Sequence, residues 1–149
     1  MLTFEHAMGR ITIHLHGAAK EKAYAEMLDN YGNRLKLYNI SIITHSSKKS
    51  LEKYFTEIDK NATLYLLDET GKQYTSQEFA KLVKQWNVSN QDVNLAIGPV
   101  DGWQEYKMRN NNLISLSEMT FPHELAAVML VEQVYRATEI IKGTKYHRN

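Results

Sequence analysis

Apolar residues recur along the chain with two different spacings, one typical of strands and one typical of helices. Ile11, Ile13 and Leu15 occupy every second position of residues 10–16, which predicts a strand. Between residues 19 and 36 the apolar positions recur every three or four residues, which predicts a helix. By the same criteria we expect strands at 38–44, 64–67, 93–97 and 113–116, helices at 51–58, 76–86 and 122–142, and a polar helix or turn at 104–112.

Strands and helices alternate over the whole length, which is typical of an α/β domain built on a mostly parallel sheet. No linker, repeat or low-complexity segment interrupts the pattern, so we expect residues 1–149 to form one domain. The residues after the third strand, 68–71, have the composition of a turn and are expected to end it.

The last predicted helix is apolar around its whole circumference from residue 125 to residue 131. A helix on the outer face of a sheet normally has a single apolar stripe, so a second side of this one must be covered. The simplest cover is another copy of the protein, which predicts a homodimer through the C-terminal helix. The alternative is a central position for this helix within a monomer.

Composition narrows the classes of protein. A hydrophobic content of 43%, a charged content of 23% and only nine Gly and Pro residues are typical of a globular chain. The absence of cysteine excludes disulfides, iron–sulfur clusters and a cysteine nucleophile. No apolar run reaches the about 20 residues that span a bilayer, and the first ten residues lack the features of a signal peptide, so we expect a cytoplasmic protein. With a net charge of +1, any contact with nucleic acid must depend on local groups.

Three predicted loops lie where ligands bind in open α/β sheets, beyond the carboxyl ends of strands. They are residues 68–71, 98–102 and 117–121. The middle loop contains glycines but has neither the dinucleotide-binding nor the P-loop order, so the loops taken alone favour ordinary tight turns over a binding site. His14 and His16 share one face of the first strand and have no third ligand nearby, which favours a polar or solvated sheet face over a metal site.

Three C-terminal segments carry a resemblance to a known family. They are residues 117–123 (Ser-Glu-Met-Thr-Phe-Pro-His), residues 130–137 (Leu-Val-Glu-Gln-Val-Tyr-Arg-Ala) and residues 146–148 (Tyr-His-Arg). They resemble the RlmH-type proteins, small SPOUT-class methyltransferases that modify a pseudouridine of large-subunit ribosomal RNA at N3. The resemblance covers about residues 64–148, whereas from 10 to 61 only the order of elements agrees.

The resemblance implies a SPOUT-type α/β fold with a C-terminal trefoil knot, a homodimer, S-adenosyl-L-methionine as cofactor, and no metal. The substrate that it implies is 23S ribosomal RNA in assembled 70S ribosomes. The cofactor contacts that it implies fall on Leu67, Gly98, Leu116, Ser117, Glu118, Met119, Thr120 and Phe121.

The implied chemistry moves a methyl group from a sulfonium to a ring nitrogen and needs no protein nucleophile. The N3–H of the base must lose its proton, so a base or an anion-stabilising group is expected nearby. The resemblance places the C-terminal tail beside the methyl group, which makes His147 and Arg148 the candidates for proton handling and charge stabilisation, with His123 as a further candidate.

Two positions differ from the family pattern. Pro99 stands where the family has a second glycine, and Ala127 stands where it generally has an arginine. These differences favour an alternative hypothesis, a non-catalytic SPOUT-like protein that binds RNA or the ribosome. The tail at residues 146–148 favours the enzyme.

Overall fold

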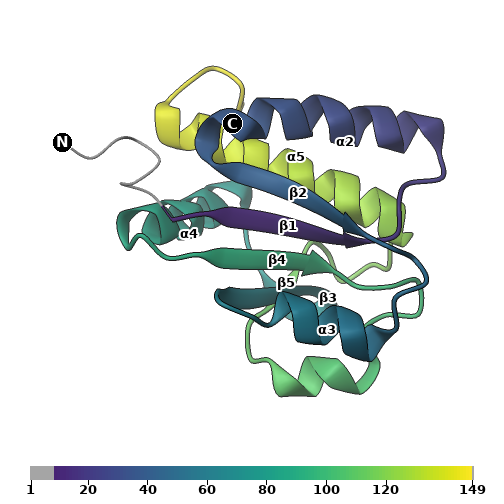
Figure 1. The fold of residues 1–149 in the computed structure, drawn as a ribbon. Coiled ribbons are helices and arrows are strands. Elements are labelled where there is room, and N and C mark those ends of the chain that lie inside the picture. Colours follow the sequence, from purple (N-terminus) through teal and green to yellow (C-terminus); the bar gives the residue numbers. More distant parts are fainter. Residues whose placement is uncertain (1–8, 149) are drawn as a thin grey trace.

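The computed structural model, which describes residues 9–148, is built on a five-stranded sheet in which all four strand pairs are parallel (Figure 1). Residues 1–8, where we expected no leader, and Asn149 lie outside the described residues. The strand order is β2-β1-β4-β3-β5. The strands are β1 (Ile11–His16), β2 (Ile40–His45), β3 (Thr63–Gln73), β4 (Val93–Ile97) and β5 (Leu113–Ser115). The predicted α/β class with a parallel sheet is confirmed.

Helices cover both faces of the sheet (Figure 1). The α-helices are α2 (Lys22–Leu35), α3 (Leu51–Ile58), α4 (Ser76–Val88) and α5 (His123–Lys142), and the 3₁₀ helices are η1 (Lys36–Tyr38) and η2 (Gln104–Arg109). The larger core lies between the sheet and helices α2, α4 and α5, and it receives the alternating apolar residues of β1. A smaller, aromatic-rich core lies on the opposite face, beneath α3 and η2.

Most predicted helix boundaries agree with the capping groups in the structure. The Ser50 hydroxyl accepts a hydrogen bond from the Lys53 amide at 3.1 Å and so caps α3. Gly143 ends α5 in the left-handed conformation, with φ +78°. The helix predicted at 19–36 begins only at Lys22 and ends at Leu35, and Lys36 is the first residue of η1. No helix among residues 9–148 is long and apolar enough to cross a membrane.

The expectation that residues 68–71 end the third strand is wrong. β3 continues to Gln73, and its register against β5 shifts between Leu67 and Lys72. Gly71 lies so close to β5 that a Cβ at this position would be 2.5 Å from the Leu113 carbonyl carbon. The four polar residues therefore form an irregularity inside the strand, which pairing with β5 holds in place.

The expectation of a polar or solvated sheet face is met in part. The His14 side chain does lie opposite the apolar residues of β1, but only 6% of the residue is exposed. Its ring is hydrogen-bonded to His45, which in turn packs against Tyr54 of α3. The histidine face is polar and buried rather than solvated.

α5 packs on the sheet between α2 and α4 (Figure 1). This central position buries Val128, Leu130 and Val131 and accounts for much of the apolar circumference of the helix. Leu125 and Met129 remain half-buried on the outer side of α5. Burial within one chain therefore leaves a short apolar strip, which a homodimer would have to use.

Candidate functional site

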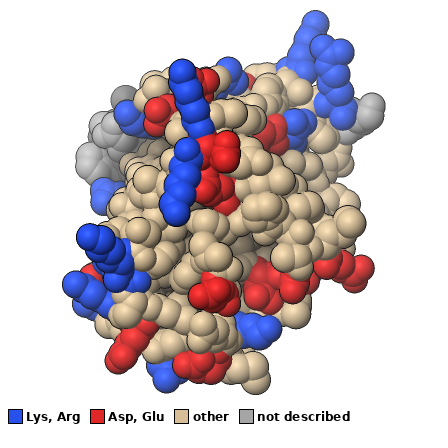
Figure 2. All heavy atoms as spheres, turned by 90° about the vertical axis from the view of Figure 1, so that its right-hand side faces the viewer, with Lys and Arg blue, Asp and Glu red and all other residues tan. Residues whose placement is uncertain are grey.

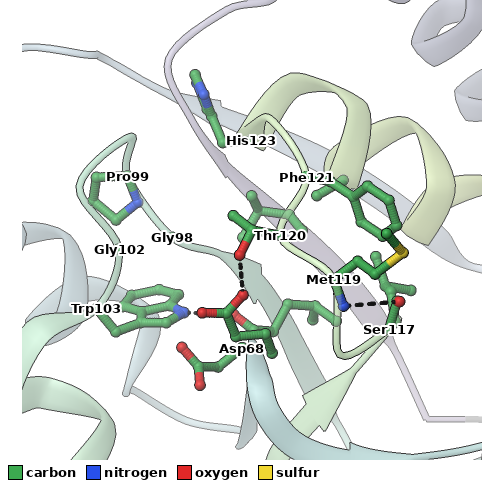
Figure 3. Close-up of a pocket in the computed structure, with 15 residues that line it drawn as sticks. Asp68, Gly98, Pro99, Gly102, Trp103, Ser117, Met119, Thr120, Phe121 and His123 are labelled. Atoms are coloured by element: carbon green, nitrogen blue, oxygen red, sulfur yellow. Dashed lines mark hydrogen bonds between the residues drawn. The ribbon is translucent and has the colours of Figure 1, made fainter.

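A cleft of about 190 Å³ opens beyond the carboxyl ends of β4 and β5, beside the irregular segment of β3 that lies between them (Figure 3). The irregular segment of β3 and the loops after β4 and β5 form its walls, and all three are segments that the sequence indicated as candidates for ligand binding. The lining residues are Leu67, Asp68, Glu69, Ile97, Gly98, Pro99, Gly102, Trp103, Leu116, Ser117, Met119, Thr120, Phe121, His123 and Ala126. This is the position at which open α/β sheets bind ligands.

The cleft brings together most of the residues that the resemblance marked as cofactor contacts. Leu67 lies in β3 at the start of its irregular segment, Gly98 and Leu116 directly follow β4 and β5, and four residues of the loop 117–121 complete this group. Glu118 does not line the cleft, and its side chain is exposed. His123 lies at the rim, with its ring pointing away from Asp68 (Figure 3).

A buried aromatic pair supports the floor of the cleft. Trp103 is 2% exposed, and its indole Nε1–H donates to the Leu67 carbonyl at 2.8 Å. Tyr54 stacks on Trp103 with ring centroids 5.6 Å apart and donates its hydroxyl to the Ile97 carbonyl at 2.8 Å. The pair therefore fixes the carbonyl of Leu67, in the middle of β3, and that of Ile97, the last residue of β4. Sequence reasoning missed both aromatic residues, and the only signal was a tryptophan directly after the glycine-bounded loop 98–102.

Gly98 lies against this aromatic floor. A Cβ at position 98 would be 3.1 Å from the Trp103 ring, closer than ordinary van der Waals contact. The next residues form a tight turn in which the Gly102 amide donates to the Pro99 carbonyl at 2.8 Å. Proline at position 99 is compatible with this turn, because the turn uses its carbonyl and not an amide hydrogen.

The cleft is acidic. Asp68 and Glu69 are among its lining residues, and Glu69 accepts a hydrogen bond from the Thr120 hydroxyl. No lining residue in the described part of the chain is Lys or Arg; the Lys107 ammonium group lies outside the lining, 3.9 Å from Asp68. Figure 2 looks onto this side of the molecule and shows carboxylates beside a largely uncharged hollow. Such a site suits a ligand with positive charge and hydroxyl groups better than a phosphate-rich one.

The C-terminal tail does not reach this cleft within one chain. The His147 ring contacts Arg136 at 3.1 Å, and the Tyr146 hydroxyl donates to Glu132 at 2.8 Å, so the tail folds back against the later turns of α5. Arg136 lies thirteen positions after His123 in the same helix, which corresponds to about 20 Å along the axis. The structure therefore places His147 and Arg148 away from the cleft of their own chain, beside which they were predicted to lie.

A second and larger cavity, of about 520 Å³, runs along the outer side of α5. We call it the α5 groove. Its walls come from Met27 of α2, the first turn of α4 and the end of β5, and its base contains Leu125, Met129 and Glu132. Because Glu132 holds Tyr146, the groove lies next to the C-terminal tail.

A buried histidine network lies on the opposite face, where β1 and β2 end under α3. His14 Nδ1 is 2.9 Å from His45 Nε2, and His45 Nδ1 is 2.9 Å from the Lys49 ammonium group. Burial and the neighbouring Lys49 charge lower the pKa of His45 to about 4. Within residues 9–148 no group of three or more His, Asp or Glu side chains is arranged to hold a metal ion.

Comparison with known proteins agrees with this geometry. Residues 8–147 match a family described as a predicted SPOUT methyltransferase. The ribosomal RNA large subunit methyltransferase H of Mycoplasmopsis synoviae (strain 53) is 35% identical and covers 93% of this chain and 100% of its own. The proteins of the same name from Coprothermobacter proteolyticus and Prochlorococcus marinus (strain MIT 9515) are 40% and 36% identical, over 89% and 93% of this chain and 94% and 96% of their own. The chain therefore belongs to the SPOUT methyltransferase family.

Proposed function

We propose that the protein is an S-adenosyl-L-methionine-dependent ribosomal RNA methyltransferase that methylates N3 of a pseudouridine in 23S ribosomal RNA on assembled ribosomes. The observation that carries the proposal is the meeting of the irregular segment of β3 with the loops after β4 and β5 around one cleft. The relatives described above are named for methylation of large-subunit ribosomal RNA, which supports the substrate class.

The chemistry of the cleft fits the proposed methyl donor. Its positively charged sulfonium suits a cleft lined by Asp68 and Glu69, whose carboxylates also accept hydrogen bonds from ribose hydroxyls. The backbone of Gly98 and of the loop 117–121 offers amide and carbonyl partners for the adenine, and Leu116 and Phe121 supply apolar surface. When bound, this cofactor supplies the methyl group.

The proposed catalytic site requires two chains. If two copies pack their α5 grooves together around a two-fold axis that passes near Met129 and is perpendicular to α5, their α5 helices run antiparallel. Position 136 of one helix then lies opposite about position 122 of the other, because the two numbers are equally far from 129. The tail that Arg136 holds would thus lie next to the partner's cleft, close to position 123 of the partner helix. Within one chain the same tail and cleft are about 20 Å apart along α5. We also propose that the C-terminal part forms the trefoil knot of the family.

The decisive measurement is mass spectrometry of ribosomal RNA from ribosomes that lack the mark, incubated with the protein and S-adenosylmethionine. We expect one methyl group on a pseudouridine of 23S RNA, and much less methylation of free RNA of the same sequence, because the nearly neutral chain has little bulk attraction for naked RNA. Cofactor binding without any methylation would instead support the non-catalytic RNA- or ribosome-binding alternative.

A further inference from the structure

The C-terminal tail contains a chain of hydrogen bonds whose last member is His147. The Glu132 carboxylate accepts two bonds from the Arg136 guanidinium, from Nη2 at 2.7 Å and from Nε at 3.2 Å. The third nitrogen of the same guanidinium, Nη1, is 3.1 Å from Nδ1 of His147. Each nitrogen of Arg136 therefore has an assigned partner.

The direction of the last bond follows from chemistry alone. A guanidinium carries only donors, so Nδ1 of His147 must be the acceptor and has no hydrogen. A neutral imidazole that accepts at Nδ1 carries its proton on Nε2. We propose that His147 serves the reaction as a hydrogen-bond donor through Nε2 rather than as a proton-removing base, and that Glu132 and Arg136 are positioning residues that fix this tautomer.

The neighbours of Arg136 hold the guanidinium in this orientation. The Tyr146 hydroxyl donates to the same Glu132 carboxylate at 2.8 Å, and the Tyr146 ring lies 4.9 Å from the guanidinium carbon. The Glu132 and Arg136 side chains are only 18% and 24% exposed, so water competes weakly for these bonds. The tautomer is thus set within a single chain before any substrate binds.

The consequence for catalysis rests on the proposed function. In the methyl transfer, the bond from N3 to the methyl carbon forms as the bond from sulfur to that carbon breaks, and the N3 proton leaves. Loss of this proton places negative charge on the two carbonyl oxygens beside N3. A donor such as Nε2–H of His147 stabilises that charge, and the proton can then leave to water. In this tautomer neither ring nitrogen is free to take it.

Nuclear magnetic resonance tests the tautomer without requiring activity. Long-range correlation of ring protons with ¹⁵N in histidine-labelled protein distinguishes a protonated Nε2 from a protonated Nδ1, and the His147 signals are assigned by their loss in His147→Gln. We expect the Nε2–H form in the parent and a mixture of both forms in Arg136→Met. Arg34→Met is the matched control, because Arg34 stacks on Tyr31 and Tyr135 without contacting His147. An Nδ1–H form in the parent, or no change in Arg136→Met, would overturn the proposal.

Two amide variants test the role in catalysis. Gln places its amide nitrogen near the position of Nε2, whereas Asn places it near that of Nδ1. We expect His147→Gln to methylate ribosomes within about 10-fold of the parent and His147→Asn to be slower by about 100-fold. The pH profiles of the methylation rate should have the same shape on the acidic side in the parent and in His147→Gln. Equal loss in both variants, with a parental rate that falls on the acidic side through titration of His147, would show a base and contradict the donor role. A parent that methylates no ribosomes would overturn the proposed function, while the tautomer is still decided by the spectra.

Discussion

Gly98 is the residue at which one added carbon should change ligand binding most directly. Calorimetry should show S-adenosylmethionine binding at roughly micromolar strength. Because a Cβ at position 98 would be 3.1 Å from the Trp103 ring, Gly98→Ala should weaken binding by about 10-fold, and Gly98→Val should abolish it. Gly32→Ala is the control, since the atom nearest to its added carbon is the terminal methyl of Ile42, outside the cleft. Equal affinity in Gly98→Val and the parent would show that the ligand binds elsewhere.

The resemblance marked Gly98 as a cofactor contact but gave no physical reason for a glycine at this position. A glycine after a strand can serve a turn or a close approach, and the contact that decides between them comes from Trp103, five residues later. His14 shows the reverse case. Alternation along β1 correctly placed its side chain opposite the apolar face, but its burial depends on α3, which no local pattern reveals. The direction of the His14 side chain was predictable from the local sequence, whereas the residues that pack against it were not.

The packing of α3 against the ends of β1 and β2 makes stability depend on pH. His45 faces His14 and His16 of β1, Lys49 of the following loop and Glu57 of α3. Its pKa in the folded protein is about 4, below its ordinary value of 6.5, and burial also lowers the pKa of His14. Between pH 4 and pH 6.5 the unfolded chain binds more protons at these histidines than the folded protein does. The free energy of unfolding is therefore highest above about pH 6.5 and falls as the pH drops toward 4.

Urea unfolding at several pH values measures this dependence. The midpoint should be nearly constant above pH 7 and should decrease between pH 6.5 and 4. In His45→Leu the decrease should be smaller, because one titrating group is lost, although the midpoint at pH 7 should also fall with the lost hydrogen bonds. His123→Leu, at the half-buried first residue of α5 and outside this network, is the matched control. A slope unchanged in His45→Leu would exclude the network as its source.

Element boundaries were predictable where local groups set them, as at the Ser50 cap and at Gly143. The irregularity in β3 was not, because residues 68–71 look like a turn and only their pairing with β5 keeps them in the strand. β5 itself is only Leu113–Ser115, and the loop that follows it closes the cleft together with the loop after β4 and the irregular segment of β3. The cleft thus depends on a long-range register that hydrophobic spacing does not encode.

At the scale of the whole molecule, the α5 groove determines how a dimer should be tested. Val128 and Val131 are buried within the chain, so charges there would unfold it rather than separate two copies. Leu125 and Met129 line the groove and remain half-buried, so Leu125→Asp or Met129→Asp should give a folded monomer. Light scattering should report about twice 17.3 kDa for the parent and for Met108→Asp, an exposed methionine outside the groove. A monomeric parent would contradict the proposed dimer.

A heterodimer tests whether the tail of one chain completes the cleft of the other. Gly98→Val disables the cleft, and His147→Ala disables the tail, so each homodimer should be slower than the parent by about 100-fold or more. If the tail acts across the interface, a heterodimer of the two variants, isolated through two different tags, contains one site with an intact cleft and an intact tail. Because its other site carries both defects, we expect about half of the parental activity. If each tail served its own chain's cleft, every site would carry one defect and the heterodimer would stay inactive. Arg136 holds His147 on the outer side of α5, about 20 Å along the helix from the cleft rim at His123, and this geometry favours the shared site.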